Sequence, residues 1–292
     1  MINALTVDVE DYYNIFSRDW LGIDLPPTQA VVANTRRIIE LLAERDTRAT
    51  FFFLGEVARE YPSLVKGVVA AGHELGVHGM NHSQVFKLSR DDFARDTSEA
   101  KRIIEDCAGC EAPGYRAPAF SICPDTAWAL EVIADLGFRY DSSIFPISGR
   151  RYGWPGFRRD IHEAALPGGR RIIEAPACTV GLLGLSLPAC GGGYLRHFPY
   201  WVTRLAMRRV QRCRPAVVYM HPYEIDAWQP PADFAALLAR ADGRTRRFHR
   251  MQVRNRDTVV WKLSRLLGEF GFAPLGQVID RTLGARTGYL KG

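Results

Sequence analysis

The chain has 292 residues, of which 47% are hydrophobic and 24% are charged, and it carries a net charge of +6 at pH 7. This length is ample for one large core, and the composition is ordinary for a soluble enzyme. No apolar run approaches the roughly 18 residues of a membrane span, and the first residues lack the basic and apolar regions of a signal peptide. We therefore expect a cytoplasmic protein with no transmembrane segment.

The excess of positive charge is concentrated in two arginine-rich stretches, 204–214 and 240–256. Such a basic face can attract nucleic acid, anionic lipid head groups or an acidic polymer. Both stretches lack the interleaved aromatic and basic residues of a nucleic-acid module, so we interpret them as exposed helix faces and predict no nucleic-acid partner. Peripheral contact with a membrane stays open, and the sequence does not indicate the oligomeric state.

Six cysteines are spread along the chain, and only Cys107 and Cys110 have CxxC spacing. A zinc knuckle needs a second such pair, and a thioredoxin-like motif belongs beside a strand, whereas this pair follows a charged helical stretch. We predict free, reduced cysteines, as in other cytosolic proteins.

The first predicted element is a buried strand over residues 4–9, because this run is apolar and contains β-branched residues. The run ends among three acids, Asp8, Glu10 and Asp11. Alternate residues of a strand share a face, so Asp8 and Glu10 can both point at one site. Carboxylates that converge in this way need a cation or a raised pKa.

A helix over 28–45 follows, then a strand over 49–54 that is buried on both faces, then a helix over 56–71. Pro62 marks a break in this second helix. The next strand, 73–77, leads to the histidine pair.

His78 and His82 are four residues apart. Two neutral imidazoles at this spacing can converge on a borderline metal such as zinc, and a carboxylate usually completes a hydrolytic site. The spacing alone is weak evidence because such pairs occur by chance. His73, at the start of the strand, is interpreted as a structural histidine.

Further polar residues follow a helix over 91–107. Arg116 lies at the end of a strand, where an arginine beside a cluster of acids is a natural orienting partner. After a helix over 124–136, Asp141 lies just past another strand. His221 comes directly after a strand over 216–220.

The segment 144–193 is irregular, with one clear strand at 171–175, and loops of this length usually build a wall or lid of a site. Beyond residue 231 the chain changes character, and helices are predicted over 234–241 and 258–270, joined by an arginine-rich segment. We expect residues 227–292 to form a basic helical extension packed on the preceding domain.

Polar residues thus recur at the ends of successive strands that alternate with helices. This order indicates an α/β fold with a parallel sheet and crossover helices. The carboxyl ends of parallel strands converge when the sheet closes into a barrel. Residues 1–226 are therefore predicted to form an irregular (β/α) barrel.

Five motifs resemble, in their order, those of the polysaccharide deacetylases of carbohydrate esterase family 4, the NodB-homology group. They occupy residues 6–11, 78–82, 116–119, 140–143 and 220–221. The resemblance covers residues 3–226 and implies a barrel of seven strands. The commonest family motif has adjacent aspartates followed by glycine, whereas this chain has Asp8-Val9-Glu10-Asp11, and Gly79 stands where the family often has serine or threonine.

The resemblance implies a divalent metal ion, zinc with cobalt or nickel as alternatives. His78 and His82 would bind it together with a carboxylate. Some subgroups of the family space the two acids by one residue, which makes Glu10 the ligand. Asp11 is the competing ligand, and the sequence leaves this choice open.

The resemblance also assigns the catalytic roles. Asp8 would be the general base, held and kept ionised by Arg116. The backbone N–H of Ala119 would help to stabilise the oxyanion, and His221 would protonate the departing amine. Asp141 would orient His221 or contact the sugar.

The implied function is metal-dependent removal of acetyl groups, N-acetyl groups of an amino sugar, from a polysaccharide or its precursor. The stretches at 7–13 and 140–146 and the basic extension resemble the subgroup linked to exopolysaccharide export with exosortase-type (PEP-CTERM) systems. The partner is then an acetylated glycan. Candidates for stacking on sugar rings, half of which we expect in the core, are Tyr12, Tyr13, Phe120, Tyr152, Trp154 and Trp228.

Two other functions fit the same residues. An allantoinase-like hydrolase on this fold acts on a small cyclic amide, and a small closed pocket would favour it, whereas an open groove would favour a glycan. A catalytically silent glycan-binding protein would lack the base or the acid. Both Asp8 and His221 are present, which disfavours that reading.

Overall fold

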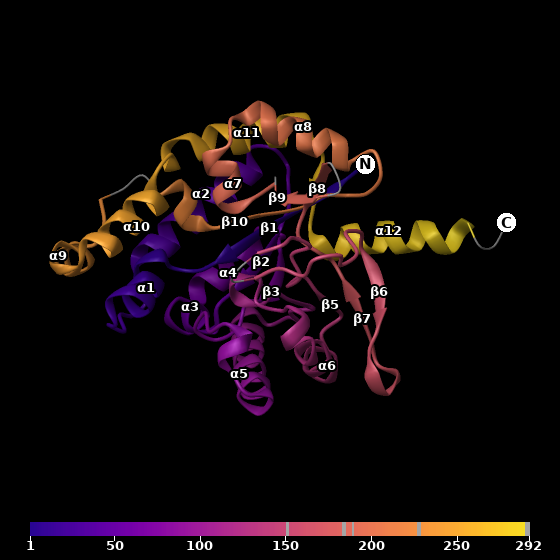
Figure 1. The fold of residues 1–292 in the computed structure, drawn as a ribbon, viewed down its shortest axis with the longest axis horizontal. Helices are drawn as coiled ribbons and strands as arrows, with labels where there is room; N and C mark the ends of the chain where they lie inside the picture. Colours follow the sequence, from indigo (N-terminus) through magenta and orange to yellow (C-terminus); the bar gives the residue numbers. More distant parts are fainter. Residues whose placement is uncertain (150–151, 183–184, 189, 227–228, 290–292) are drawn as a thin grey trace.

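The structure is a computed structural model, and it describes residues 1–149, 152–182, 185–188, 190–226 and 229–289. One large curled sheet forms its centre, with the strand order β10-β1-β2-β3-β4-β5-β7-β6 (Figure 1). Every neighbouring pair from β10 to β7 is parallel, which makes seven consecutive parallel strands, and β6 runs antiparallel to β7. The predicted irregular (β/α) barrel is confirmed, as a half-barrel with one antiparallel edge.

The strands are short, and several have only two to four residues. The sheet consists of β1 (Asn3–Val9), β2 (Thr50–Phe53), β3 (Glu74–Val77), β4 (Gly114–Tyr115), β5 (Tyr140–Asp141), β6 (His162–Ala165), β7 (Arg171–Glu174), β10 (Val217–Met220) and β11 (Phe272–Ala273). A separate antiparallel hairpin consists of β8 (Thr179–Leu182) and β9 (Leu185–Pro188).

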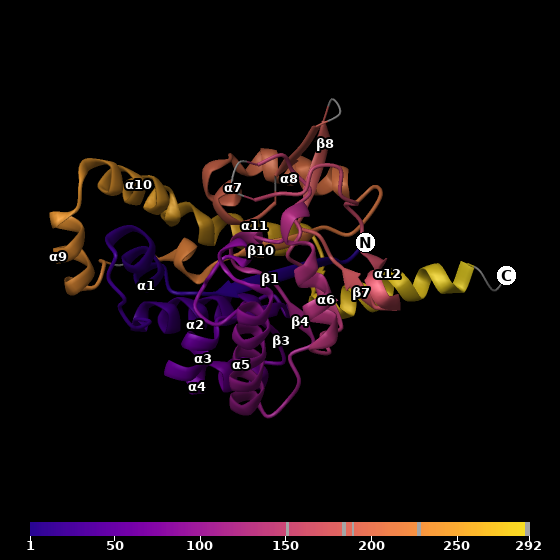
Figure 2. The same cartoon turned by 60° about the horizontal axis from the view of Figure 1, so that its bottom comes forward.

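Helices cover the outer face of the sheet, with α3 to α6 along one side and α8 and α11 along the other (Figures 1 and 2). They are α1 (Tyr12–Phe16), α2 (Gln29–Ala43), α3 (Gly55–Glu60), α4 (Pro62–Ala70), α5 (Arg90–Ala108), α6 (Trp128–Asp135), α7 (Gly192–His197), α8 (Tyr200–Val210), α9 (Ala232–Arg240), α10 (Gly243–Val253), α11 (Val259–Glu269) and α12 (Leu275–Tyr289). A π-helix, Ser17–Leu21, continues α1.

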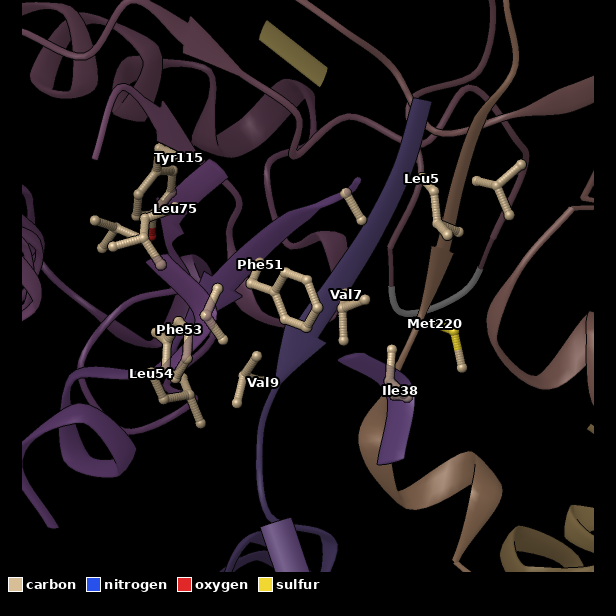
Figure 3. Close-up of a cluster of buried hydrophobic side chains, with 14 of the residues drawn as sticks. Leu5, Val7, Val9, Ile38, Phe51, Phe53, Leu54, Leu75, Tyr115 and Met220 are labelled. Atoms are coloured by element: carbon tan, nitrogen blue, oxygen red, sulfur yellow. The ribbon is translucent and has the colours of Figure 1, made fainter. Parts of the chain in front are cut away.

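Alternation along β1 decides which side chains face the helices and which face the interior of the barrel. Leu5, Val7 and Val9 belong to the main core between sheet and helices, together with Phe51 and Phe53 of β2 (Figure 3). Because side chains of a strand alternate between its two faces, Thr6, Asp8 and then Glu10 lie on the inner side. The apolar face of β1 therefore packs in the core and anchors the strand, and its polar face points to the interior of the barrel.

The C-terminal residues take part in the sheet and not only in its surroundings. β11 pairs in parallel with β1 at Asn3 and Ala4. At the start of α12, the N–H of Leu275 donates to Thr50 Oγ1 at 2.7 Å and that of Gly276 to Glu74 Oε2 at 3.0 Å. Apolar side chains of α12 join Ala4 and other residues in a second buried cluster. These contacts close the amino-terminal end of the barrel.

Several elements differ from the sequence predictions. The second helix is divided at Tyr61 into α3 and α4, because Pro62 begins α4 and has no N–H to continue α3. The irregular segment contains the β6–β7 and β8–β9 pairs. The arginine-rich stretch within 240–256 forms a helix, α10, in agreement with its interpretation as a helix face. All six cysteines are free, as predicted. No helix within the described residues is both long and apolar enough to cross a membrane.

Candidate metal and catalytic site

Three side chains converge where β1 and β3 end. Glu10 directly follows β1, His78 directly follows β3, and His82 lies in the loop beyond it. Glu10 Oε2 is 3.1 Å from His82 Nε2 and 3.4 Å from His78 Nε2. Glu10 and His78 are buried, and one ligand atom from each of the three residues lies within 4.8 Å of the others.

This cluster fits a divalent metal ion. Ligand bonds near 2.1 Å place neighbouring ligand atoms about 3.0 to 3.4 Å apart in tetrahedral or octahedral geometry. The distances from Glu10 Oε2 to the two imidazole nitrogens, 3.1 and 3.4 Å, lie in this range. Glu10 Oε2 is buried and has no hydrogen-bond partner among the described residues. His78 Nδ1 lies 2.8 Å from the carbonyl oxygen of Arg116, which fixes the ring and leaves Nε2 free for a metal.

The electrostatics of Glu10 also suit a cation. Burial alone would raise the pKa of its carboxyl, but the imidazoles of His82, His221 and His78 outweigh burial and lower the pKa well below its usual value. The carboxyl is therefore ionised in this environment. An ionised carboxylate with two imidazoles is a set of donors that zinc accepts.

A buried ion pair lies beside the cluster. Arg116 Nη1 donates to Asp8 Oδ1 and to Thr6 Oγ1, both at 2.7 Å. Its Nη2 and Nε donate to the hydroxyl and the carbonyl of Ser142 at 2.9 and 3.2 Å. The guanidinium lies 4.4 Å from the ring centroid of Phe52. Arg116 therefore holds one oxygen of Asp8 in a fixed place, and Oδ2 remains turned toward the site.

His221 completes the site from the end of β10. Its Nε2 is 3.8 Å from Asp8 Oδ2 and 3.7 Å from Glu10 Oε1. Its Nδ1 is 3.5 Å from Oε2 of Glu224, and the same oxygen accepts the backbone N–H of His221 at 3.1 Å. Burial lowers the pKa of His221, but Glu10, Glu224 and Asp8 outweigh it and raise the pKa to about 9. The carboxylates around the imidazole thus favour its protonated form.

Two residues singled out in the sequence lie elsewhere. The Asp11 carboxylate begins α1, where it accepts the N–H groups of Tyr13, at 2.9 Å, and Thr28. It therefore acts as a helix cap, and Glu10 is the acid that lies with the two histidines.

Asp141 is fully buried, and it accepts the N–H and the hydroxyl of Ser143 at 2.7 and 2.5 Å. Burial raises its pKa to about 6 and raises the pKa of the neighbouring Glu174 well above its usual value. The acid beside Nδ1 of His221 is Glu224 and not Asp141.

Backbone strain is concentrated at this site. Of the five non-glycine residues with positive φ among those the structure describes, His82, Ala119 and Phe120 lie here, with φ of 63°, 53° and 51°. Side chains with a Cβ rarely adopt this conformation, and it persists only where the surroundings enforce it. The oxyanion role of the Ala119 N–H stays a prediction.

A pocket of 120 Å³ opens beside Glu10 and His82. We call it the metal-site pocket. Tyr12, Phe16 and Trp20 line it from α1 and the π-helix, and Tyr223 lines it after β10. Helix α10 supplies Phe248 and Gln252.

Aromatic contacts fasten α10 to α1 and the π-helix. The rings of Trp20 and Phe248 are stacked with centroids 4.0 Å apart, and Tyr12 Oη lies 3.0 Å from His249 Nδ1. Of the stacking candidates, Tyr12, Tyr13 and Phe120 are buried in clusters, and Tyr152 and Trp154 pack against buried residues. Trp228 lies outside the described residues.

Two family models match the chain. Residues 20–140 match the polysaccharide deacetylase family, and residues 142–280 match a domain of unknown function (DUF3473). Residues 20–140 of the chain thus match a polysaccharide deacetylase domain. The matched residues include His78, His82 and Arg116 of this domain, whereas His221 lies within the second match.

Named relatives resemble the deacetylase domain over part of their length. A peptidoglycan-N-acetylglucosamine deacetylase of Bacillus cereus is 31% identical over 33% of this chain and 36% of its own. A chitooligosaccharide deacetylase of Sinorhizobium fredii is 36% identical over 29% of this chain and 40% of its own. The chain thus spans well under two thirds of the length of these curated relatives.

A solved structure supports the fold. A crystal structure from Mycobacterium smegmatis, described as a polysaccharide deacetylase, has a TM-score of 0.64 with 18% identity, and the match covers 97% of this chain and 90% of that one. At this identity the likeness shows the fold alone, and it extends over nearly the whole chain.

Sequence reasoning missed two parts of the candidate site. Glu224 follows His221 by three residues, and only the 3₁₀ turn Pro222–Ile225 brings it back to the imidazole. The wall from α10 comes from a segment that was interpreted as an exposed helix face. The i+3 spacing of Glu224 after a strand-end histidine was the one local signal available.

Proposed function

We propose that this protein is a metal-dependent hydrolase that removes acetyl groups, N-acetyl groups of an amino sugar, from a polysaccharide or its precursor. One observation carries the proposal. The buried cluster of Glu10, His78 and His82 lies against both an arginine-held carboxylate, Asp8, and an imidazole, His221. Metal ligands, a base and an acid are the groups that amide hydrolysis requires.

Glu10, His78 and His82 would hold the metal ion, which we propose to be zinc. When bound, such an ion supplies Lewis acidity for the acetyl carbonyl and lowers the pKa of a water molecule from 15.7 to about 7. Cobalt or nickel would be accepted by the same donors.

Asp8 takes the proton from the attacking water through Oδ2, the oxygen that Arg116 leaves free. Arg116 keeps this carboxylate in one position, because it binds Oδ1 and is itself held by Thr6 and Ser142. His221 then gives a proton from Nε2 to the departing amine nitrogen. Glu224 stabilises the imidazolium from the other side of the ring.

The shape of the site supports a chain-like substrate. The metal-site pocket has 120 Å³, enough for an acetamido group, and it shares Trp20 and Phe248 with an adjoining groove of 1040 Å³. A glycan extends beyond its acetyl group and needs such a groove, whereas a small cyclic amide does not. The presence of Asp8 and His221 in position speaks against a silent binding protein.

The biological setting is part of the same proposal. We place the reaction in exopolysaccharide biosynthesis and in the cytoplasm. Deletion of the gene should alter the acetyl content of the secreted polysaccharide, and cell fractionation with an antibody should recover the chain in the cytoplasmic fraction. Unchanged acetylation in the deletion strain would contradict this setting.

The decisive experiment combines metal analysis with acetate release from N-acetylglucosamine oligomers. We expect about one equivalent of divalent metal per chain and acetate release that a chelator abolishes. Asp8→Asn should keep the metal and lose turnover by about 10² or more, since general bases contribute 10² to 10⁴. His82→Ala should lose both metal and turnover.

Asp125→Asn, which changes an exposed aspartate, is the matched control and should match the parent chain. Absence of metal, together with no hydrolysis of any acetylated glycan after zinc, cobalt or nickel is added, would refute the proposed function.

A further inference from the structure

A groove of 1040 Å³ adjoins the metal-site pocket. It is lined by α10, by His197 at the end of α7 and by the π-helix, and α10 lies beside α1 and its π-helical continuation in both views (Figures 1 and 2). Trp20 and Phe248 line both spaces, so their stacked rings form the partition between the groove and the pocket. A ligand that lies across this partition therefore reaches both.

The groove is positively charged. Arg244, Arg247, Arg250 and Arg254 line it from α10 and the residue that follows it, and no acidic side chain lines it among the residues that the structure describes. Arg247, Arg250 and Arg254 are exposed and form no ion pair within the described chain. Elsewhere many exposed arginines do pair, as Arg204 does with Glu269.

Like charges three and four residues apart destabilise a helix, and α10 carries them without acidic neighbours on that face. The aromatic contacts that hold α10 against α1 and the π-helix offset this destabilisation of the helix. Burial, together with the positive charges of Arg196 and Arg254, also lowers the pKa of His197 at the groove's edge. The lining of the groove thus carries positive charges that no acidic side chain of the same lining offsets.

We propose that this groove binds a negatively charged group of the glycan, a carboxylate or a phosphate, while the acetylated sugar occupies the metal-site pocket. The arginine side chains match such oxyanions with paired N–H groups, and Trp20 and Phe248 offer apolar faces to the sugar between them. The substrate class is then an anionic glycan and not a neutral one. This inference rests on the proposed function, because it assumes that an acetylated sugar enters the pocket.

The test measures binding to the Asp8→Asn chain, which holds ligand without turnover. Three probes are compared by calorimetry: neutral chitotetraose, a hyaluronan tetrasaccharide with carboxylates, and uridine diphosphate N-acetylglucosamine with a diphosphate. Arg247→Gln/Arg250→Gln should weaken binding of one or both anionic probes by about tenfold and leave chitotetraose unchanged. The anionic probe that is affected more identifies the anion as carboxylate or phosphate.

Arg208→Gln/Arg212→Gln is the matched control, because it removes the same charge from exposed arginines within and after α8. It should leave all three affinities within about twofold of the parent. Equal affinities in the groove variant and the control for both anionic probes would overturn the inference. Acetate release from chitotetraose by the unmodified chain is a separate readout, so failure of the proposed function is distinguished from failure of this one.

Discussion

Arg116 is the most enclosed charged side chain of the site, with no exposed surface. All three of its nitrogen atoms donate, to Asp8, Thr6 and Ser142. A guanidinium has a planar fork of donors that fits such partners, whereas an ammonium is a point charge on a flexible stem. The position of Asp8 thus depends on arginine chemistry, and the substitution Arg116→Lys would not preserve it.

Glu224 is the residue whose role the structure adds. Glu224→Gln keeps the size of the side chain and an acceptor for the His221 N–H but removes the charge beside Nδ1. We expect kcat for acetate release at pH 7 to fall about tenfold with metal content unchanged, because the imidazolium loses a stabilising carboxylate.

Glu60→Gln is the control for this experiment, because it makes the same change, loss of one carboxylate charge, at an exposed residue of α3. If Glu224→Gln released acetate as fast as the control, the carboxylate would have no part in catalysis.

His73 gives a prediction of stability against pH. Its Nδ1 accepts the N–H of Ala49 at 3.2 Å, and burial lowers its pKa to about 4. Between about pH 6.5 and 4 the unfolded chain binds a proton here that the folded chain does not, so this histidine makes stability fall as pH falls. His73→Asn, which keeps an acceptor near Nδ1, should show a shallower loss of unfolding free energy over this range.

Urea unfolding at several pH values measures the effect, and the difference between the two chains isolates this histidine from other titrating groups. Parallel curves for parent and variant would show that His73 is protonated equally in both states.

At the scale of elements, sequence prediction succeeded where apolar residues repeat. The run over 49–54 and the periodic stripe over 28–45 predicted β2 and α2 within two residues at each end. β4 and β5 have two residues each, too few for any period, so only the polar residues beyond them could be recognised. α10 is polar almost throughout, and its few packing residues, such as Phe248 and His249, meet partners from α1 that are remote in sequence.

Helix α12 also packs against partners that are remote in sequence. A substitution in it tests the domain boundary predicted at residue 226. Ile279 is fully buried in the second cluster, against residues of the sheet. Ile279→Ala should lower the free energy of unfolding by about 2 to 5 kcal/mol, as truncation of buried isoleucine does in other cores. Gln277→Ala, two residues away on the exposed side, should change it by less than about 0.5 kcal/mol.

Thermal and urea unfolding provide the measurement. A loss at Ile279 as small as at Gln277 would mean that residues 227–292 form a separable extension, as the sequence suggested, and that the barrel does not need them.

For the whole molecule, the sequence predicted the barrel and the convergence of Glu10, His78, Arg116 and His221, because each follows a strand. The parallel order of the sheet then brings these strand ends together without further information. The partners that hold these residues could not be predicted in the same way. Ser142 and Glu224 act through loop geometry, and loops carry no repeating pattern that a sequence reveals.

The central place of β1 has a consequence for synthesis on the ribosome. β1 is made before every other strand of the described sheet, yet its neighbours include β10 and β11, and the bond between Ala216 and Asn3 spans 213 residues. Until those strands emerge, one edge of β1 stays unpaired, with Asp8 and Glu10 beside it and no His221. For most of translation the nascent chain therefore carries an unpaired edge of β1 and a candidate site that still lacks His221. An unpaired strand edge invites aggregation, so β1 is a defined segment for chaperones to protect.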